Sequence, residues 1–232
     1  MPGHTLVITR RHAETVFDLT VEEAQAHGAA VAAAARARPA GRAGPAGRRA
    51  AAALGAGRVW STGAMSLVVV HAGESASSRT RAVAVAALEA GGGGELVELS
   101  QLSADGLLGR AADPAVDAAV AAASGASVLV LASPVYRATV SGALKAFLDR
   151  FATGALAGTA VVLVATAAIP EHYLSLDTSG RALVASLEGW TVPTVVYATS
   201  DQVVDGQVSE AVRDRLTRAL GEASAVARTT RT

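Results

Sequence analysis

Cysteine is absent from this chain of 232 residues, and lysine occurs only once, at Lys145. Without cysteine there are no disulfides, no thiolate metal ligands and no cysteine nucleophile, so any redox chemistry must come from a bound cofactor. The absence also fits a reducing compartment, and we expect a cytoplasmic protein. The scattered carboxylates show no metal-ligand spacing, so we expect no bound metal.

Long hydrophobic runs are missing as well. None approaches the roughly 18 to 20 residues that a membrane span requires, and acidic residues interrupt the N-terminal region, so neither a span nor an export signal is expected. Hydrophobic residues nevertheless make up 51% of the chain and charged residues only 17%, which is enough apolar surface for one sizeable core.

The chain has no excess of charge of either sign, since its formal net charge is zero. Residues 1–64 hold 8 Lys/Arg against 4 Asp/Glu, and residues 65–232 hold 12 against 16. The larger part is therefore mildly acidic and lacks the basic stripe that nucleic-acid binding requires. We expect no nucleic-acid partner.

Strand-like and helix-like patterns alternate from residue 66 onward. Apolar runs predict strands at 66–73, 94–100, 127–133, 159–166 and 193–199. Periodic segments predict helices at 79–89, 114–123, 141–151, 172–187 and 209–225. Strands separated by helices require crossover connections, which are right-handed in nearly all proteins. We therefore predict an α/β fold with a flavodoxin-like, doubly wound, five-stranded parallel sheet in the order 2-1-3-4-5.

The first 64 residues do not follow this alternation. A strand is predicted at 4–12 and a helix at 19–37, but 35–58 consists almost entirely of Ala, Arg, Gly and Pro. Such a stretch has too few bulky side chains to offset the entropy of ordering the backbone. We predict a small strand-helix segment at 1–34, a flexible linker at 35–64, a flavodoxin-like domain at 65–227 and a tail at 228–232.

The most informative segment is 128–150, VLVLASPVYRATVSGALKAFLDR. Its first four residues are uniformly apolar, which is typical of a central parallel strand covered on both faces. Ser133 and Pro134 are predicted to end this strand sharply, because proline removes a backbone donor and fixes its own φ. Tyr136 would then place its ring just beyond the carboxyl end of the strand, where flat ligands dock on open α/β sheets.

The turn after the first predicted strand is rich in hydroxyls and precedes a helix start. Free backbone N–H groups, the helix dipole, the hydroxyls of Ser75, Ser78 and Thr80, and the charge of Arg79 or Arg81 would together attract a phosphate. Ordinary helix capping is the alternative. Because the turn lies beside the switch point between strands 1 and 3, this loop and the 133–137 corner should flank a single crevice.

Other features have structural interpretations. The chain has no G-x-G-x-x-G fingerprint and no Walker lysine motif. The run Gly91–Gly94 is predicted to end a helix, and Lys145 is expected to be a solvated surface charge. His71 is expected to be packed or hydrogen-bonded, while Trp190 and Tyr197 are expected to pack in the core or at subunit interfaces.

Residues 66–220 resemble the NADPH-dependent FMN reductase family, in particular flavin reductases that supply reduced FMN to alkanesulfonate-type monooxygenases. The resemblance is carried by AGESASSRT at 72–80, SPVYRATVSGALKAFLDR at 133–150, and the segment 165–204. By this resemblance the FMN phosphate would be held by Ser75, Ser78, Arg79 and Thr80. The isoalloxazine ring would be lined by Pro134, Val135, Tyr136 and Arg137, and its pyrimidine edge would be approached by the loop from Thr166 to His172. His172 opening the next helix is the alternative.

The resemblance implies an enzyme that passes hydride from NADPH to FMN, with no side-chain acid or base. It also implies a homodimer or homotetramer. Reduced FMN would leave for a monooxygenase, or FMN would stay bound and reduce a quinone or azo compound. A non-enzymatic FMN electron carrier and a protein that has lost flavin binding are the alternatives from other classes.

Three positions depart from the family pattern, and each is expected to weaken flavin binding. Glu74 stands where relatives usually carry Ser, and a carboxylate repels a phosphate unless it points into water. Val140 occupies a position that is often aromatic. Ala167-Ala168 replaces a Gly-Gly pair that allows the backbone close to the flavin.

The N-terminal segment resembles the strand-and-helix portion of histidine-triad nucleotide hydrolases over about forty residues. That chemistry requires histidines at alternating strand positions, and this chain has no H-x-H-x-H motif. We therefore expect residues 1–34 to be a non-functional fragment: either a fusion relic, or the product of a mis-assigned upstream start, with Met65 as the natural beginning.

Overall fold

The computed structural model describes residues 65–75 and 78–230. They belong to one compact unit, Thr62–Thr232. The predicted histidine-triad-like fragment at 1–34 and the predicted linker at 35–64 lie outside the described residues.

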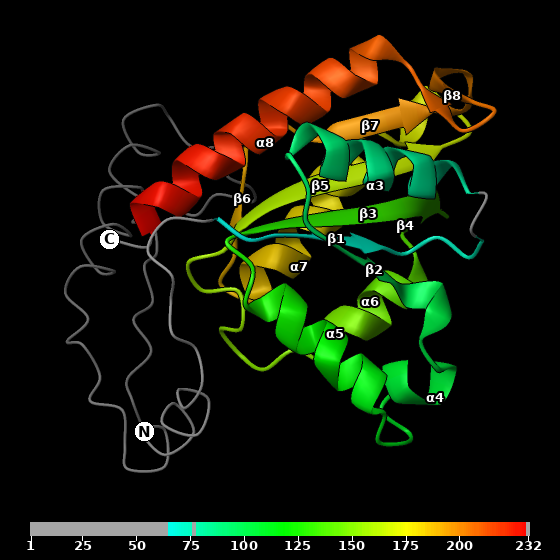
Figure 1. Ribbon diagram of the computed structural model, residues 1–232. Coiled ribbons are helices and arrows are strands. Elements are labelled where there is room, and N and C mark those ends of the chain that lie inside the picture. The colour runs from blue at the N-terminus through cyan, green and yellow to red at the C-terminus, as the bar shows by residue number, and fades with distance from the viewer. Residues whose placement is uncertain (1–64, 76–77, 231–232) are drawn as a thin grey trace, which may run out of the picture. The chain divides into compact units, whose positions relative to one another are not determined.

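A parallel sheet forms the centre of this unit (Figure 1). Its strands are β1 (Leu67–His71), β2 (Glu95–Glu98), β3 (Val128–Tyr136), β5 (Ala160–Ala167), β6 (Trp190–Thr191) and β7 (Val196–Thr199). The order is β2-β1-β3-β5, and both β6 and β7 then pair with β5. The predicted order 2-1-3-4-5 is therefore confirmed, with the fifth position shared by two short strands. Every residue of β5 is buried, as expected for a strand covered on both faces.

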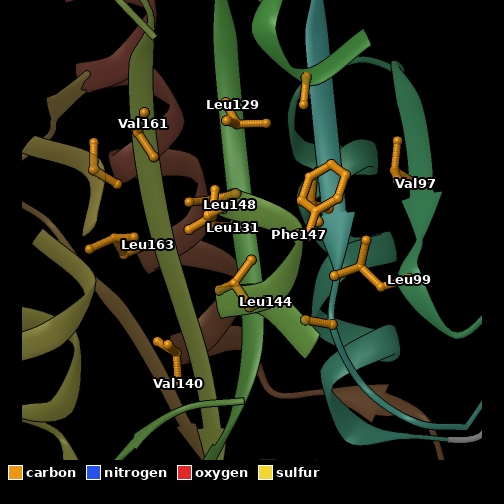
Figure 2. Close-up of a cluster of buried hydrophobic side chains, with 14 of the residues drawn as sticks. Val97, Leu99, Leu129, Leu131, Val140, Leu144, Phe147, Leu148, Val161 and Leu163 are labelled. Carbon is orange, nitrogen blue, oxygen red and sulfur yellow. The ribbon is translucent and has the colours of Figure 1, made fainter. Parts of the chain in front are cut away.

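Helices cover both faces of the sheet (Figure 1). One face packs against α3 (Arg79–Ala90) and α8 (Glu210–Thr230). The opposite face packs against α4 (Ala104–Leu107), α5 (Pro114–Ser124), α6 (Gly142–Leu148) and α7 (Arg181–Ser186). Figure 2 shows this second layer, where Phe147 and Leu144 of α6 lie among Leu129 and Leu131 of β3 and Leu163 of β5. Alternate residues of the strands face the two layers, so two separate clusters of buried side chains form.

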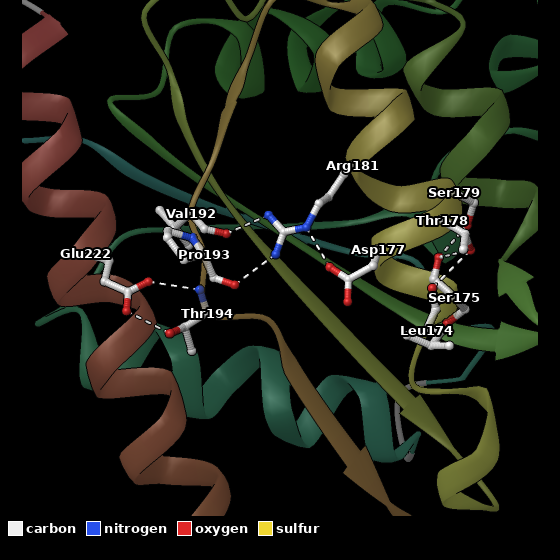
Figure 3. A network of polar contacts seen from close by, with 10 residues as sticks. All are labelled: Leu174, Ser175, Asp177, Thr178, Ser179, Arg181, Val192, Pro193, Thr194 and Glu222. Carbon is white, nitrogen blue, oxygen red and sulfur yellow. Dashed lines mark hydrogen bonds and ion pairs between the residues drawn. The ribbon is translucent and has the colours of Figure 1, made fainter. Parts of the chain in front are cut away.

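The break between β6 and β7 is bridged by side chains. The Val192 N–H still donates to the Val161 carbonyl of β5 at 3.0 Å, but residues 192–195 are not part of a strand. Arg181 donates to the carbonyl oxygens of Val192 at 2.9 Å and Pro193 at 2.8 Å, and the Glu222 carboxylate accepts from the Thr194 N–H at 2.9 Å (Figure 3). These bonds satisfy backbone groups that the sheet does not pair.

The strand before Tyr136 is longer than predicted. β3 does not end at Ser133: it continues through Pro134, which pairs with Thr166, to Tyr136. The Ala72 N–H donates to the Ala132 carbonyl, so the backbone groups of Ala132 point toward the β1 side of the strand. Those of Pro134, two residues further along β3, point to the same side, where β1 has already ended. The missing N–H of Pro134 therefore leaves no ladder bond unmade.

A tight hairpin follows. Tyr136 pairs with Thr139 of β4 (Thr139–Val140). The two linking residues, Arg137 and Ala138, have φ values of 52° and 59°. Both therefore adopt the left-handed conformation that a two-residue hairpin turn requires and that glycine or asparagine usually supplies.

The predicted helix at 172–187 is wrong as a single element. The chain forms a 3₁₀ turn at Pro170–His172 (η3), a π-helical turn at Leu176–Gly180 (η4) and only then α7. The hydroxyls of Thr178 and Ser179 donate to carbonyls four residues earlier, and such bonds compete with regular helical pairing.

Other boundaries also differ from the prediction. α8 continues to Thr230 instead of ending near 225, so residues 228–230 are helical and not a tail. Two 3₁₀ turns, Leu99–Gln101 (η2) and Ser200–Gln202 (η5), and a small hairpin of β8 (Val203–Val204) and β9 (Gln207–Val208) were not predicted.

Tyr197, Trp190 and Lys145 lie in different environments. Tyr197 is buried, as expected, and its hydroxyl donates to the Ile169 carbonyl at 2.6 Å. Trp190 does not join the core and is 59% exposed, because β6 lies at the sheet edge. Lys145 lies on the exposed side of α6 in an ion pair with Asp149.

Candidate functional site

One pocket lies where β1, β3 and β5 reach their carboxyl ends. We call it the strand-end pocket, and its volume is about 560 Å³. Its lining residues are Gly73, Glu74, Ser75, Ser78, Arg79, Thr80, Pro134, Val135, Tyr136, Thr166, Ala167 and Ala168. The volume lies within the range of small-molecule sites, and the position is the usual one for ligands in open α/β sheets. The predicted single crevice between the serine-rich loop and the 133–137 corner is confirmed.

The polar end of the strand-end pocket is the start of α3. Ser78 is the N-cap of this helix, and its hydroxyl accepts from the Arg81 N–H at 3.1 Å. The capping alternative therefore describes the hydroxyl of Ser78 in this structure. The first-turn N–H groups of a helix lack intrahelical acceptors, and the helix dipole adds partial positive charge, so this end of the pocket favours an anion.

Thr80 and Thr166 fix the distance between α3 and β5. Their hydroxyl oxygens are 2.6 Å apart, and both side chains are buried. One hydroxyl donates to the other, which leaves the second hydroxyl with a hydrogen that it can still donate. Residues 86 positions apart in the sequence thus form one polar wall of the strand-end pocket.

His71 lies directly behind this polar end and is fully buried. Its Nε2 atom is 2.9 Å from the hydroxyl oxygen of Ser78, and its Nδ1 atom is 3.7 Å from Oε1 of Glu98. Glu98 also accepts a hydrogen bond of 2.7 Å from Nε of Arg81. Burial lowers the pKa of His71, the Glu98 carboxylate opposes that shift, and the Arg81 charge adds to it. His71 is therefore a packed, hydrogen-bonded residue, as predicted.

The apolar end of the strand-end pocket is formed by Pro134, Val135 and Tyr136. The Tyr136 side chain is 48% exposed, so one side of its ring is available for stacking. A hydrogen bond joins the end of β3 to the residue before α6: the buried Ser133 hydroxyl accepts from the Ser141 N–H at 2.8 Å. The hairpin and the start of α6 are therefore fixed relative to each other.

Two predicted cofactor residues do not line the strand-end pocket. Arg137 lines a neighbouring, mostly apolar pocket of about 740 Å³ that shares Tyr136 and extends over α6 and α7. His172 lines neither of these two pockets; it ends the short η3 turn.

The departures from the family pattern fall in different places. Glu74, Ala167 and Ala168 line the strand-end pocket, so each can affect a ligand there. Val140 does not line it: its side chain is buried in the core beneath the hairpin. It lines the neighbouring pocket that shares Tyr136 instead.

Gly73 was not identified from the sequence as a site residue. A Cβ atom at this position would lie 2.5 Å from Nε2 of His71 and 2.7 Å from the hydroxyl oxygen of Ser78. Only glycine leaves room for the contact between these two side chains. A glycine directly after an apolar strand and before a serine-rich helix start was the available signal.

Within 65–75 and 78–230, no group of three or more His, Asp or Glu side chains could hold a metal ion. Among the same residues, no helix is both long enough and apolar enough to cross a membrane.

A comparison with protein families matches residues 65–203 to a family described as NADPH-dependent FMN reductase. The chain belongs to this family. The match covers every residue that lines the strand-end pocket. The family resemblance inferred from the sequence is therefore confirmed.

The names of similar proteins specify either NADH or NADPH as the electron donor. The "NADH-dependent FMN reductase SfnF" of Pseudomonas fluorescens is 36% identical over 102 residues, which cover 44% of this chain and 54% of that protein. The "FMN reductase (NADPH)" of Escherichia coli is 36% identical over 77 residues, which cover 33% of this chain and 40% of that protein. This chain thus spans about half the length of the curated relatives it matches.

Solved structures agree with the assignment of the fold. An NADH:FMN oxidoreductase (EMOB), in its apo form, superposes with a TM-score of 0.64 at 29% identity, covering 70% of this chain and 89% of that one. An oxidoreductase from Corynebacterium diphtheriae superposes with a TM-score of 0.62 at 30% identity, covering 71% of this chain and 97% of that one. The chain therefore has the doubly wound, flavodoxin-like fold that the sequence predicted.

Proposed function

We propose that this protein is an NAD(P)H-dependent FMN reductase, an enzyme that transfers hydride from a reduced nicotinamide to FMN. The observation that carries the proposal is that one pocket joins a hydroxyl-lined helix start to the exposed ring of Tyr136. A phosphate-bearing flat molecule needs both features within its own length. Membership of the FMN reductase family supplies the reaction.

The residues present fit an FMN molecule. Ser75, Ser78, Arg79 and Thr80 would hold its phosphate, since hydroxyls, a cation and helix N–H groups converge there. The ring would lie against Pro134, Val135 and Tyr136, with Ala167 and Ala168 of the 166–172 segment toward its pyrimidine edge. Thr166, whose hydroxyl oxygen lies 2.6 Å from that of Thr80, belongs to the phosphate end. Arg137 and His172 are not part of the proposed contact set, because neither lines this pocket.

The chemistry belongs to the cofactor: FMN, when bound, accepts a hydride on its ring system. The protein's residues bind and orient. The Tyr136 ring would fix the plane of the flavin, and the polar wall of Thr80 and Thr166 would fix the depth of the phosphate. Together they would orient one face of the flavin toward the nicotinamide. Glu74 is exposed, so its carboxylate can turn into water, away from the phosphate.

Consumption of NADPH and of NADH, measured with and without added FMN, tests the proposal. Turnover that requires FMN, with either nicotinamide, is the expected result. Bound FMN without nicotinamide consumption would favour an electron carrier instead. Absence of flavin binding would refute the proposed function altogether. Adding quinones and azo compounds to the same assay would reveal a reductase that retains its FMN.

Replacing Tyr136 is a direct test of the strand-end pocket. Tyr136→Ala should weaken FMN binding by about 1 to 3 kcal/mol, the scale of stacking between an aromatic side chain and a base-like ring. Quenching of flavin fluorescence measures the dissociation constant. Trp190→Ala is the matched control, because it removes an exposed aromatic side chain from β6, which pairs with the opposite end of β5. Equal dissociation constants for wild type and Tyr136→Ala would contradict the pocket assignment.

The cellular setting is part of the same proposal. We expect a cytoplasmic homodimer or homotetramer that hands reduced FMN to a flavin-dependent monooxygenase. The apolar pocket over α6 and α7, with Ala182 and Leu183 in its lining, is a surface on which a second copy would bury apolar area. Sedimentation analysis of the full chain measures the oligomeric state.

A further inference from the structure

His71 is a buried polar side chain that the proposed function does not use. It is completely inaccessible to solvent, yet it lies in direct contact with the phosphate end of the strand-end pocket through Ser78. Its Nδ1 atom has no hydrogen-bond partner among the described residues. A buried imidazole with one bonded and one unbonded nitrogen calls for a physical explanation.

The surroundings of His71 determine which nitrogen carries the hydrogen when the ring is neutral. Nδ1 faces the Glu98 carboxylate at 3.7 Å. A lone pair on Nδ1 would be repelled by that negative charge, whereas an N–H is attracted to it. The neutral ring therefore carries its hydrogen on Nδ1, and Nε2 is a hydrogen-bond acceptor.

This tautomer determines the role of the Ser78 hydroxyl. With Nε2 as an acceptor, Ser78 must donate its only hydrogen to His71 across the 2.9 Å contact. The same oxygen already accepts from the Arg81 N–H. Only a lone pair of Ser78 then remains toward the pocket, and a lone pair repels a phosphate oxygen.

We propose that His71 is a positioning residue whose protonation is coupled to binding of the phosphate group in the strand-end pocket. With a proton on Nε2, His71 becomes the donor to Ser78, and the Ser78 hydroxyl is released to donate to the phosphate. The second N–H, on Nδ1, then faces Glu98 as an ion pair. This inference rests on the proposed function, because it assumes that the phosphate of FMN lies beside Ser78.

The charged groups around His71 are consistent with this coupling. Glu98 approaches from the end of β2 and Arg81 from α3, and these two are already paired with each other. Arg79 and Glu74 lie on the lining of the strand-end pocket. β3 contributes the uncharged Ala132 beside His71. No second histidine faces the ring among the described residues, so one proton is expected to move.

Phosphate binding in the strand-end pocket should become stronger as the pH falls. Burial lowers the pKa of His71, so the ring is neutral at neutral pH in the protein without ligand. A dianionic phosphate next to the Ser78–His71 pair raises that pKa. By linkage, a proton must then strengthen phosphate binding by the same factor as the phosphate strengthens proton binding.

The first experiment measures proton uptake directly. Calorimetric titration of the full-length protein with FMN near pH 7.5, in two phosphate-free buffers of different ionisation enthalpy, should show uptake of about one proton. At that pH the FMN phosphate is already dianionic, since its second pKa is about 6, so it takes up little itself. Riboflavin, which has the same ring and no phosphate, should show no uptake.

The second experiment uses the pH profile of the dissociation constant. Between about pH 8 and pH 6.5 the wild-type protein should bind FMN at least about fivefold more tightly as the pH falls, while riboflavin binding stays constant. His71→Gln should lose this dependence, because its amide can donate to Ser78 without a proton from solvent. Ser78→Ala should lose it too, although His71 is unchanged. Thr217→Ala, which removes an exposed hydroxyl from α8, is the matched control and should keep it.

The outcomes separate this inference from the proposed function. FMN binding without proton uptake, or with the same pH profile in wild type and Ser78→Ala, would overturn the coupling and leave the reductase intact. Equal proton uptake with FMN and riboflavin would also overturn it. Failure of the wild-type protein to bind FMN at any pH would refute both.

Discussion

At the scale of single residues, the buried histidine behind the pocket makes stability depend on pH. Burial lowers the pKa of His71 in the folded protein, whereas in the unfolded chain it has the ordinary value near 6.5. Below that pH the unfolded state binds the extra proton more readily, so stability is full above about pH 6.5 and decreases as the pH falls toward the folded pKa.

Thermal unfolding of the flavin-free protein between about pH 5.5 and pH 8 measures this effect. The midpoint temperature should fall on the acid side for wild type and stay flatter for His71→Gln. Carboxylates contribute at lower pH: hydrogen bonds from Ser103 and Thr194 lower the pKa values of Asp113 and Glu222, respectively. Parallel pH profiles for wild type and His71→Gln would show that His71 is not the group responsible.

At the scale of structural elements, the hairpin after β3 contains strain that can be relieved. Arg137 and Ala138 both have positive φ values, and a side chain in that conformation costs roughly 1 to 2 kcal/mol. Ala138→Gly removes the Cβ that causes the cost, although glycine loses more entropy on folding. We expect a net stabilisation of about 0.5 to 1 kcal/mol, which raises the midpoint of unfolding by a few degrees.

The same change elsewhere provides the control for the hairpin. Ala115 is exposed in the first turn of α5, an ordinary right-handed helix. Ala115→Gly should destabilise the protein by up to about 1 kcal/mol, because glycine lacks the helix propensity of alanine. Destabilisation by both changes, measured by urea unfolding, would mean that the hairpin carries no such strain.

At the scale of the whole molecule, the sheet and its two helix layers form the unit that the pocket requires. β1 begins at Leu67, and the family match begins at residue 65. A chain that starts at Met65 should therefore unfold cooperatively and bind FMN with a dissociation constant within about twofold of the full chain, since every pocket residue is retained. Circular dichroism melts and flavin titrations measure both. A large loss of affinity on this truncation would place part of the site in residues 1–64.

The sequence predicted the regular parts of this molecule because their signals are local. Apolar runs separated by helical periodicity require crossover connections, and the strand order and the crevice at the switch point follow from that. It could not predict the end of β3, because that strand extends by pairing with β5 and β4, and Pro134 is tolerated only because β1 has already ended beside it. The break of the 172–187 helix also depends on hydroxyl-to-backbone bonds that periodicity does not reveal.

The sequence by itself thus determined the fold class, the family and most of the pocket lining. Only the tertiary structure decided that Arg137 and His172 do not line the strand-end pocket, and that His71, Ser78 and Glu98 meet behind its polar end. The reason is physical: a side-chain pattern is read along one element, whereas the approach of Glu98 to His71 is set by the register of β2 against β1. The chemistry of the site depends on that register.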